Sequence, residues 1–147
     1  MILVKTMLGA AVSVTNTVQK PRIAVRTTLP YAGVESGGCK PLDCRFDING
    51  DACGYFQIHY AYYIDCHKPK PGWEKCSKDY NCASRCVRAY MARYKNLSYA
   101  GTNCESYARL HNGGPSGANK QITSPPIYDS TTPYWKKVKA QGCSINS

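Results

Sequence analysis

The nine cysteines of this 147-residue chain constrain its fold more than any other feature of the sequence. The first is Cys39 and the last is Cys143, and no two of them form the Cys-x-x-Cys pair that is typical of a structural zinc site. Their mixed spacings favour a disulfide framework, formed in an oxidising compartment, over zinc. Because the number is odd, at least one cysteine lacks a partner within the chain. The length predicts one compact domain.

A net charge of +10, spread along the whole chain, predicts anionic partners. Nucleic acid, an anionic membrane and acidic polymers of bacterial walls all meet that description. The basic residues form no long block, and with the aromatic residues they form no known nucleic-acid-binding module, so we expect no specific nucleic-acid partner. The 12 tyrosines supply flat faces with a polar tip, which suit either sugar stacking or half-buried packing.

The first 33 residues differ from the rest because they contain neither acids nor cysteines. They begin with an apolar run that Lys5 interrupts. Such a start is typical of a secretory signal peptide or of a misassembled N-terminus, and it fits an organellar transit peptide less well. The run is too short to span a membrane, so no membrane span is expected. We therefore predict an atypical segment at 1–33 and a folded domain at 34–147.

The remaining patterns predict a mixed α and β domain. Residues 44–58 are typical of a β-hairpin with its turn at Asn49-Gly50, flanked by Cys44 and Cys53. Residues 79–97 predict a helix capped by Asp79. One face of this helix carries an apolar stripe, formed by Val87, Tyr90, Met91 and Tyr94. A second helix is expected from 103 to 111 and a short last one before Gly142. Residues 115–133 predict a loop.

Four of the nine acidic residues lie between positions 35 and 51, namely Glu35, Asp43, Asp47 and Asp51. Glycoside hydrolysis needs two carboxyl groups in different environments, one protonated and one ionised. A glutamic acid packed against apolar residues at a helix end would have a raised pKa, whereas an aspartate beside backbone N–H groups would stay charged. The three aspartates also suit turns, so the spacing alone leaves both interpretations open.

Six sequence blocks resemble the invertebrate-type (i-type) lysozymes, also called the destabilase family, in letters, order and spacing. They are "VESGGC" (34–39), "CGYFQI" (53–58), "YYIDC" (62–66), "CASRCVRAYMARY" (82–94), "YARLHNGGP" (107–115) and "YWKKVKAQGC" (134–143). The resemblance covers about three-quarters of the chain. It implies a small lysozyme-like α+β domain, mainly helical, with one short β-hairpin and disulfide staples.

The resemblance also implies an activity, namely hydrolysis of the β-1,4 bond of bacterial peptidoglycan by a secreted, extracellular, monomeric enzyme. Glu35 would be the general acid and Asp47 the nucleophile or ion-pair stabiliser. The residues that would bind substrate are His59, Tyr62, Tyr63, Asp65, Tyr90, His111, Asn112 and Gly113. A helix-capping role for His111 remains open. The implied partners are peptidoglycan and the anionic bacterial surface, and no metal or organic cofactor is implied.

The family pattern implies three disulfides, which are Cys44–Cys53, Cys66–Cys86 and Cys76–Cys82. Three other family cysteines are replaced here by Thr27, Pro30 and Ala32, and a further pair by Ala100 and Ala118. We therefore expect Cys39, Cys104 and Cys143 to lack their usual partners. Each bridge lost from a small secreted domain lowers its unfolding free energy by about 2–5 kcal/mol, so we expect the missing cysteines to reduce both stability and activity.

Two rival functions follow from the same residues. One is hydrolysis of ε-(γ-glutamyl)-lysine isopeptide bonds, which the resemblance implies for some destabilases and which needs a nucleophile with a nearby base. Ser36, Ser77 and His111 are available, although no pattern pairs them. The other is non-catalytic binding of bacterial surfaces, which needs only positive charge and an aromatic cleft.

Overall fold

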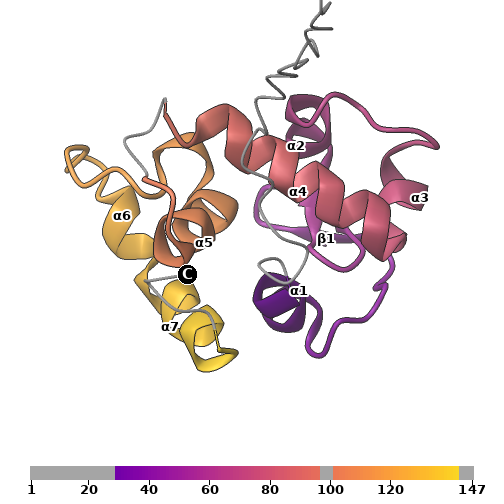
Figure 1. The fold of residues 1–147 in the computed structure, drawn as a ribbon, viewed down its shortest axis with the longest axis horizontal. Coiled ribbons are helices and arrows are strands. Elements are labelled where there is room, and N and C mark those ends of the chain that lie inside the picture. The colour runs from indigo at the N-terminus through magenta and orange to yellow at the C-terminus, as the bar shows by residue number, and fades with distance from the viewer. Residues whose placement is uncertain (1–28, 97–100, 143–147) are drawn as a thin grey trace, which may run out of the picture.

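The computed structural model describes residues 29–96 and 101–142, and it is mainly helical with one small sheet (Figure 1). The predicted signal peptide or misassembled start lies mostly outside these residues. In chain order the elements are α1 (Leu29–Ser36), β1 (Arg45–Asp47), β2 (Gly50–Cys53), β3 (Ile58–His59), α2 (Tyr60–Asp65), α3 (Trp73–Lys78), α4 (Tyr80–Tyr94), α5 (Cys104–Gly113), the 3-10 helix η2 (Gly114–Ser116), α6 (Ile127–Ser130) and α7 (Thr132–Ala140).

The predicted hairpin is present, and a third strand extends it into an antiparallel sheet of order β1-β2-β3. The turn lies one residue earlier than predicted, because Asp47 pairs with Gly50 and leaves Ile48 and Asn49 as the two-residue loop. The Asp47 side chain causes this shift, since its Oδ1 accepts a hydrogen bond of 2.8 Å from the Asn49 backbone N–H. The third strand places His59 opposite Ala52 on the free side of β2.

Helix α4 is the predicted long helix and runs across the middle of the molecule (Figure 1). Asp79 caps its N-terminus by accepting a hydrogen bond from the Cys82 backbone N–H at 2.6 Å. Val87, Tyr90 and Met91 of the predicted stripe are buried. In the view of Figure 1, the sheet, α1, α2 and α3 lie toward the right of the molecule, whereas α5, α6 and α7 form its left part.

All three predicted disulfides are present, namely Cys44–Cys53, Cys66–Cys86 and Cys76–Cys82. The first links β2 to the segment before β1, and the other two fasten α2 and α3 to α4. The expectation that Cys104 would be orphaned is wrong, because Cys104 is disulfide-bonded. Cys143, which was grouped with it, lies outside the described residues. The cross-linking of the domain therefore exceeds what the departures from the family pattern led us to expect.

Helix α1 crosses the boundary that the sequence placed between residues 33 and 34. Tyr31 and Ala32 are fully buried in the core, and the Tyr31 hydroxyl donates to the Cys104 backbone carbonyl at 3.3 Å. The turn at Gly37 and Gly38, both with positive φ, ends the helix directly after Glu35 and Ser36. The boundary was predicted from the acid-free composition of the N-terminal segment, and it therefore missed the start of the helix that carries Glu35.

Helix α5 begins at an Asn103 cap, as the pattern predicted, and packs against the last helix, α7. The predicted loop at 115–133 differs from the structure, because it contains η2 and α6 and ends inside α7. Arg109 of α5 joins this segment to α5 through hydrogen bonds. Its side chain is only 4% exposed, and its Nη1 donates to the Tyr128 carbonyl and to the hydroxyls of Thr131 and Thr132.

Replacing Arg109 by methionine should destabilise the domain by about 3–5 kcal/mol, because it removes one partner of a buried ion pair. The Nε and Nη2 atoms of Arg109 each lie 2.9 Å from Glu105 Oε1, and the substitution removes this pairing together with the hydrogen bonds that the guanidinium donates to α6 and α7. Urea unfolding measures the loss. The matched control is Arg93→Met, whose half-exposed guanidinium lies 3.9 Å from Asp65, and it should cost below about 1 kcal/mol. Equal losses would contradict the buried-pair account.

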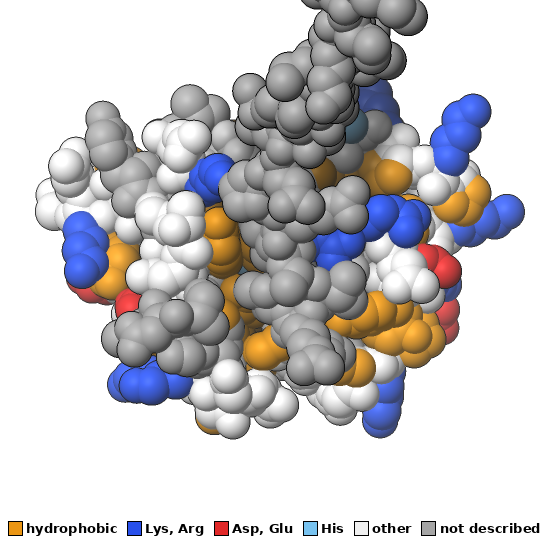
Figure 2. All heavy atoms as spheres, viewed as in Figure 1, with side chains coloured by type: hydrophobic (Ala, Val, Ile, Leu, Met, Phe, Trp, Pro, Cys, Tyr) orange, Lys and Arg blue, Asp and Glu red, His pale blue; other side chains and the backbone are white. Residues whose placement is uncertain are grey.

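On the face that Figure 2 shows, Lys and Arg side chains are spread around the edge and are not gathered in one patch. No helix within residues 29–96 and 101–142 is long and apolar enough to cross a membrane. The same residues contain no cluster of three His, Cys, Asp or Glu side chains that could hold a metal ion.

Candidate active site

Glu35 and Asp47, which the sequence singled out together, line one cleft of about 160 Å³. Helix α1 supplies Glu35 and the end of β1 supplies Asp47. The other lining residues come from the sheet, from α2 and from the end of α5, and they are Asn49, Phe56, Gln57, His59, Tyr62, His111 and Asn112. The fold therefore brings four of the eight predicted binding residues to the same cleft as the two predicted catalytic acids.

The Glu35 carboxyl lies at the inner side of this cleft, with its side chain 21% exposed. Burial is the main reason that its pKa rises from 4.5 to about 7, and the negative charge of Asp47 raises it further. The hydroxyl of Tyr134 and the charge of Lys137, both from α7, act in the opposite direction. At neutral and mildly acidic pH a large fraction of Glu35 is therefore protonated and able to give up a proton.

His111 packs against Glu35. Its Nε2 lies 3.5 Å from Glu35 Oε1, and its side chain is 4% exposed. Burial lowers the pKa of His111 from 6.5 to about 4, although a hydrogen bond with the Phe56 backbone partly opposes this. The imidazole is therefore neutral above about pH 4 and does not neutralise the glutamate by ion pairing. Burial therefore disfavours a role for His111 as a charged group at the end of α5 at neutral pH.

Two tyrosines hold the His111 ring in place from the other side. The Tyr62 hydroxyl lies 3.0 Å from His111 Nδ1. The Tyr62 ring in turn stacks on Tyr90, with 3.6 Å between ring centroids and 9° between planes. Tyr90 thus supports the cleft from behind Tyr62 and does not line it. The row from Tyr90 through Tyr62 to His111 fixes the wall that faces Glu35.

Asp47 has a different environment, since its side chain is 48% exposed at the outer end of the cleft. Its Oδ2 lies 3.0 Å from His59 Nε2, and its Oδ1 accepts the hydrogen bond from the Asn49 backbone N–H. This carboxyl is thus open to water and is contacted by a backbone donor and an imidazole. One cleft therefore holds a carboxyl whose pKa is raised by burial and another that is half exposed and bonded to polar groups.

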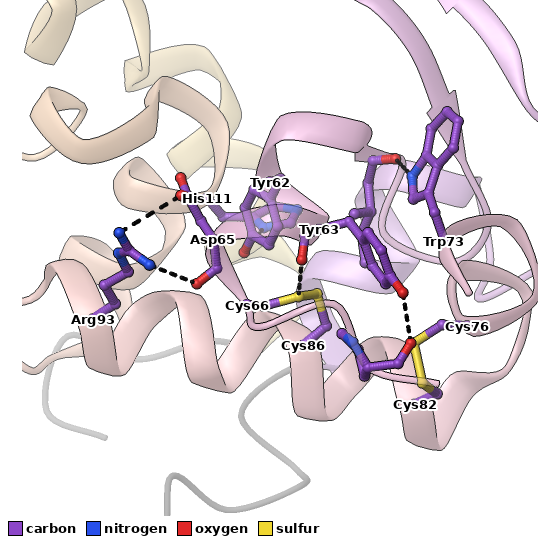
Figure 3. Close-up of a disulfide and its surroundings, with 12 residues drawn as sticks. Tyr62, Tyr63, Asp65, Cys66, Trp73, Cys76, Cys82, Cys86, Arg93 and His111 are labelled. Carbon is purple, nitrogen blue, oxygen red and sulfur yellow. Dashed lines mark hydrogen bonds and ion pairs between the residues drawn. A yellow bond between two sulfur atoms is a disulfide. The ribbon is translucent and has the colours of Figure 1, made fainter. Parts of the chain in front are cut away.

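Three predicted binding residues lie away from the cleft, besides Tyr90. Tyr63 is buried, and its hydroxyl donates to the Pro69 carbonyl at 2.7 Å, so its ring cannot stack on a sugar. Figure 3 shows Tyr63 directed toward the Cys76–Cys82 bridge, while Tyr62 lies beside His111. Asp65 accepts a hydrogen bond from the Tyr94 hydroxyl at 2.8 Å and pairs with Arg93. Gly113 packs against Thr131, where a Cβ would lie 2.5 Å from the threonine methyl.

The structure also adds residues that sequence reasoning missed. Asn49, Phe56 and Gln57 line the cleft because the sheet curls around Asp47. Tyr134 lies behind Glu35 on α7, about a hundred positions away in the chain. The only signal for it was its place in the block at 134–143, and such a block cannot show which distant side chain a tyrosine will meet.

Neither serine considered for isopeptide hydrolysis is placed as a nucleophile. Ser36 is buried, and its hydroxyl donates to the Ala32 carbonyl at 2.6 Å and accepts from the Lys40 N–H at 2.8 Å. Ser77 is 1% exposed on α3 and makes no hydrogen bond within the described residues. Neither of them lines the cleft that contains His111.

Comparison with known proteins shows which proteins this chain is similar to. The chain is 53% identical over 113 residues to a lysozyme of Ostrea edulis, covering 77% of each chain. It is 47% identical over 122 residues to an invertebrate-type lysozyme of Ruditapes philippinarum, covering 82% of this chain and 84% of the relative. The crystal structure of Tapes japonica lysozyme superimposes with a TM-score of 0.72 at 43% identity, over 82% of this chain and 93% of the other.

A sequence model of one family accounts for most of the folded part. The Destabilase model matches residues 31–143, which contain both cleft carboxyls and all three described disulfides. Its first matched residue is Tyr31 in the core of α1. The match, the relatives and the shared fold lead to one conclusion, which is that this chain belongs to the Destabilase family, together with the invertebrate-type lysozymes it resembles.

Proposed function

We propose that this protein is a secreted muramidase, a glycoside hydrolase that cleaves the β-1,4 bond between N-acetylmuramic acid and N-acetylglucosamine in bacterial peptidoglycan. The observation that carries the proposal is the contrast between the two cleft carboxyls. Glu35 has a pKa raised to about 7, whereas the half-exposed Asp47 bonds to an N–H group and faces an imidazole. This is the arrangement that a glycosidase needs for acid catalysis next to a stabilising or attacking carboxylate.

In the proposed reaction, Glu35 gives its proton to the glycosidic oxygen as the bond between that oxygen and the anomeric carbon breaks. The positive charge that develops on the sugar ring is stabilised by the Asp47 carboxylate, or captured by it as a covalent intermediate that water then hydrolyses. His59 orients Asp47 through the 3.0 Å contact. Asn112, which lies in the cleft opposite the sheet residues, offers an amide to the sugar hydroxyl or acetamide groups.

The net charge of +10 supports the choice of substrate. Bacterial walls and their attached polymers are anionic, and a strongly basic protein associates with them faster at low ionic strength. Secretion agrees with the three described disulfides, because these bonds persist in oxidising compartments. A monomer suffices for the proposed reaction, since one chain supplies every group named in it.

The test is turbidity clearing of a purified peptidoglycan suspension by the oxidatively refolded chain, followed by mass analysis of the released fragments. We expect clearing with new reducing ends on N-acetylmuramic acid. Release of cross-linking peptides without new reducing ends would identify an isopeptidase, and a chromogenic ε-(γ-glutamyl)-lysine substrate would check that result. Sedimentation with the wall but no clearing would leave a non-catalytic binder, which contradicts the proposal.

A further inference from the structure

The hydroxyl of Tyr134 is a buried hydrogen-bond donor that the proposed reaction has not yet used. Tyr134 is 8% exposed, and its oxygen has no hydrogen-bond partner of conventional geometry within the described residues. Burying such a group without a partner costs free energy, and phenylalanine would fill the same space without that cost. An unsatisfied hydroxyl in the core therefore needs a reason.

The position of Tyr134 points to that reason, because its hydroxyl interacts with the Glu35 carboxyl. Its ring packs against His111, with 6.2 Å between the ring centroids, and His111 Nε2 approaches Glu35 Oε1. Tyr134 and His111 thus face the same carboxyl from α7 and α5. A neutral imidazole has a single N–H group, and the His111 ring already shares a hydrogen bond with the Phe56 backbone, so the Tyr134 hydroxyl is the donor that can turn fully toward a negative charge on Glu35.

We infer that Tyr134 is a positioning residue, whose hydroxyl donates a hydrogen bond to the Glu35 carboxylate as the acid transfers its proton to the glycosidic oxygen. The inference rests on the proposed function, since it concerns the acid of that reaction. The only covalent events are the transfer of the Glu35 proton and the cleavage of the glycosidic bond. Tyr134 keeps its own proton throughout, because burial among anionic and phenolic neighbours makes that proton hard to remove.

The physical advantage lies in the difference between the two states of the acid. A protonated Glu35 carboxyl needs no strong donor, and in the structure the Tyr134 hydroxyl makes no full hydrogen bond within the described residues. Once the proton has left, a buried carboxylate gains a charge-assisted bond, which is about twice as strong as a neutral one. Because the interaction strengthens toward the transition state, it accelerates the chemical step and does not merely improve binding.

Other groups also face Glu35 and must be kept constant in any test. They are Asp47 of β1, Tyr62 of α2, His111 of α5 and Lys137 of α7. Asp47 raises the pKa of Glu35, and Lys137 lowers it. A substitution that removes only the Tyr134 oxygen leaves all four in place.

The experiment is Tyr134→Phe, measured by wall clearing across pH, by thermal unfolding and by carboxyl-carbon NMR titration of Glu35. We expect clearing at the pH optimum to fall by roughly 10- to 100-fold, as for the loss of a hydrogen bond to a charged group. The basic limb of the activity profile and the NMR titration of Glu35 should both move to higher pH, because the hydroxyl lowers the pKa of this carboxyl. The melting temperature should stay the same or rise.

The matched control is Tyr128→Phe, which removes a hydroxyl that donates to Glu105 Oε1 at 3.2 Å, away from the cleft. Its profile and Glu35 titration should match those of the unaltered chain. Two results for Tyr134→Phe would overturn the inference. One is an unchanged pH–activity profile together with an unchanged NMR titration of Glu35. The other is a loss of activity with a lower melting temperature and no shift of the basic limb. If the unaltered chain fails to clear walls but Tyr134→Phe still shifts the Glu35 titration, the muramidase proposal is wrong and the hydrogen bond is confirmed.

Discussion

Glu35→Gln is expected to lower wall clearing by about 10²- to 10⁴-fold, the usual effect of removing a general acid. Glutamine keeps the size of the side chain and its contact with His111 but has no proton to give at the glycosidic oxygen. The fold-loss should be about twofold smaller at pH 7 than at pH 5, because a pKa near 7 leaves about half of the unaltered chain without the Glu35 proton at pH 7, whereas the amide does not titrate. Activity above about one-tenth of the unaltered chain would contradict the role of Glu35.

The same substitution should have the opposite effect on stability, and only above mildly acidic pH. The folded-state pKa of Glu35 is raised from 4.5 to about 7, so the folded chain holds this proton more tightly than the unfolded chain does. That contribution to stability is complete below pH 4.5 and is lost as the pH rises through about 7. At pH 8 the unaltered chain therefore carries a buried charge that glutamine avoids, and Glu35→Gln should be more stable by roughly 3 kcal/mol.

Urea unfolding of both chains from pH 4 to pH 8 measures this difference. His111 contributes with the opposite sign, because its pKa is lowered to about 4, and stability from its neutral form is lost as the pH falls from 6.5 through that value. Taking the difference between the two chains removes this background. Glu74→Gln on the exposed face of α3 is the control, and it should change neither activity nor the pH dependence of stability.

Asp47→Asn is the second large loss that we expect, with clearing reduced by at least about 10²-fold. Asparagine can still accept the hydrogen bond from the Asn49 N–H, so the turn should persist. It cannot stabilise a positive sugar ring or attack it. Because Asp47 is half exposed, the unfolding free energy should change by less than about 0.5 kcal/mol. Loss of activity with unchanged folding thus separates Asp47 from Glu35.

The control for Asp47 is Asp51→Asn, which changes an exposed carboxyl on the adjacent strand of the same hairpin. It should leave clearing intact, and equal losses from the two substitutions would contradict a specific role for Asp47. Asp47→Ala with added azide distinguishes a nucleophile from a stabiliser. If Asp47 forms a covalent intermediate, azide should restore cleavage of an activated glycoside and give a glycosyl azide.

Local chemistry made several elements predictable from the sequence. The Asp79 cap and the stripe of Val87, Tyr90 and Met91 predicted α4, because a cap and a 3.6-residue period both act within one helix. The three disulfides were predicted as well, although from the family pattern and not from spacing alone. The hairpin was predicted with its turn displaced by one residue, since the side chain of Asp47 competes for the Asn49 N–H.

Adjacent residues in α2 show where sequence reasoning fails. Tyr62 and Tyr63 are chemically identical, and both were expected to bind sugar. In a helix, neighbouring side chains point about 100° apart, so one ring faces the cleft while the other enters the core. The sequence indicated neither that this short segment is helical nor how it is rotated. For the same reason, Asp65 pairs with Arg93 and Tyr94 of α4 and does not line the cleft that holds Glu35 and Asp47.

The sequence by itself determined which groups this protein has for its chemistry, namely a cluster of acids with a hairpin turn, cysteines to cross-link the chain and a strongly basic surface. These features depend on residue type and short spacing. Only the tertiary structure decided how the two carboxyls differ, because the pKa of Glu35 depends on burial by α5 and α7, which lie far along the chain. Desolvation and the directed hydroxyl of Tyr134 are properties of a packed interior, and a linear pattern does not encode them locally.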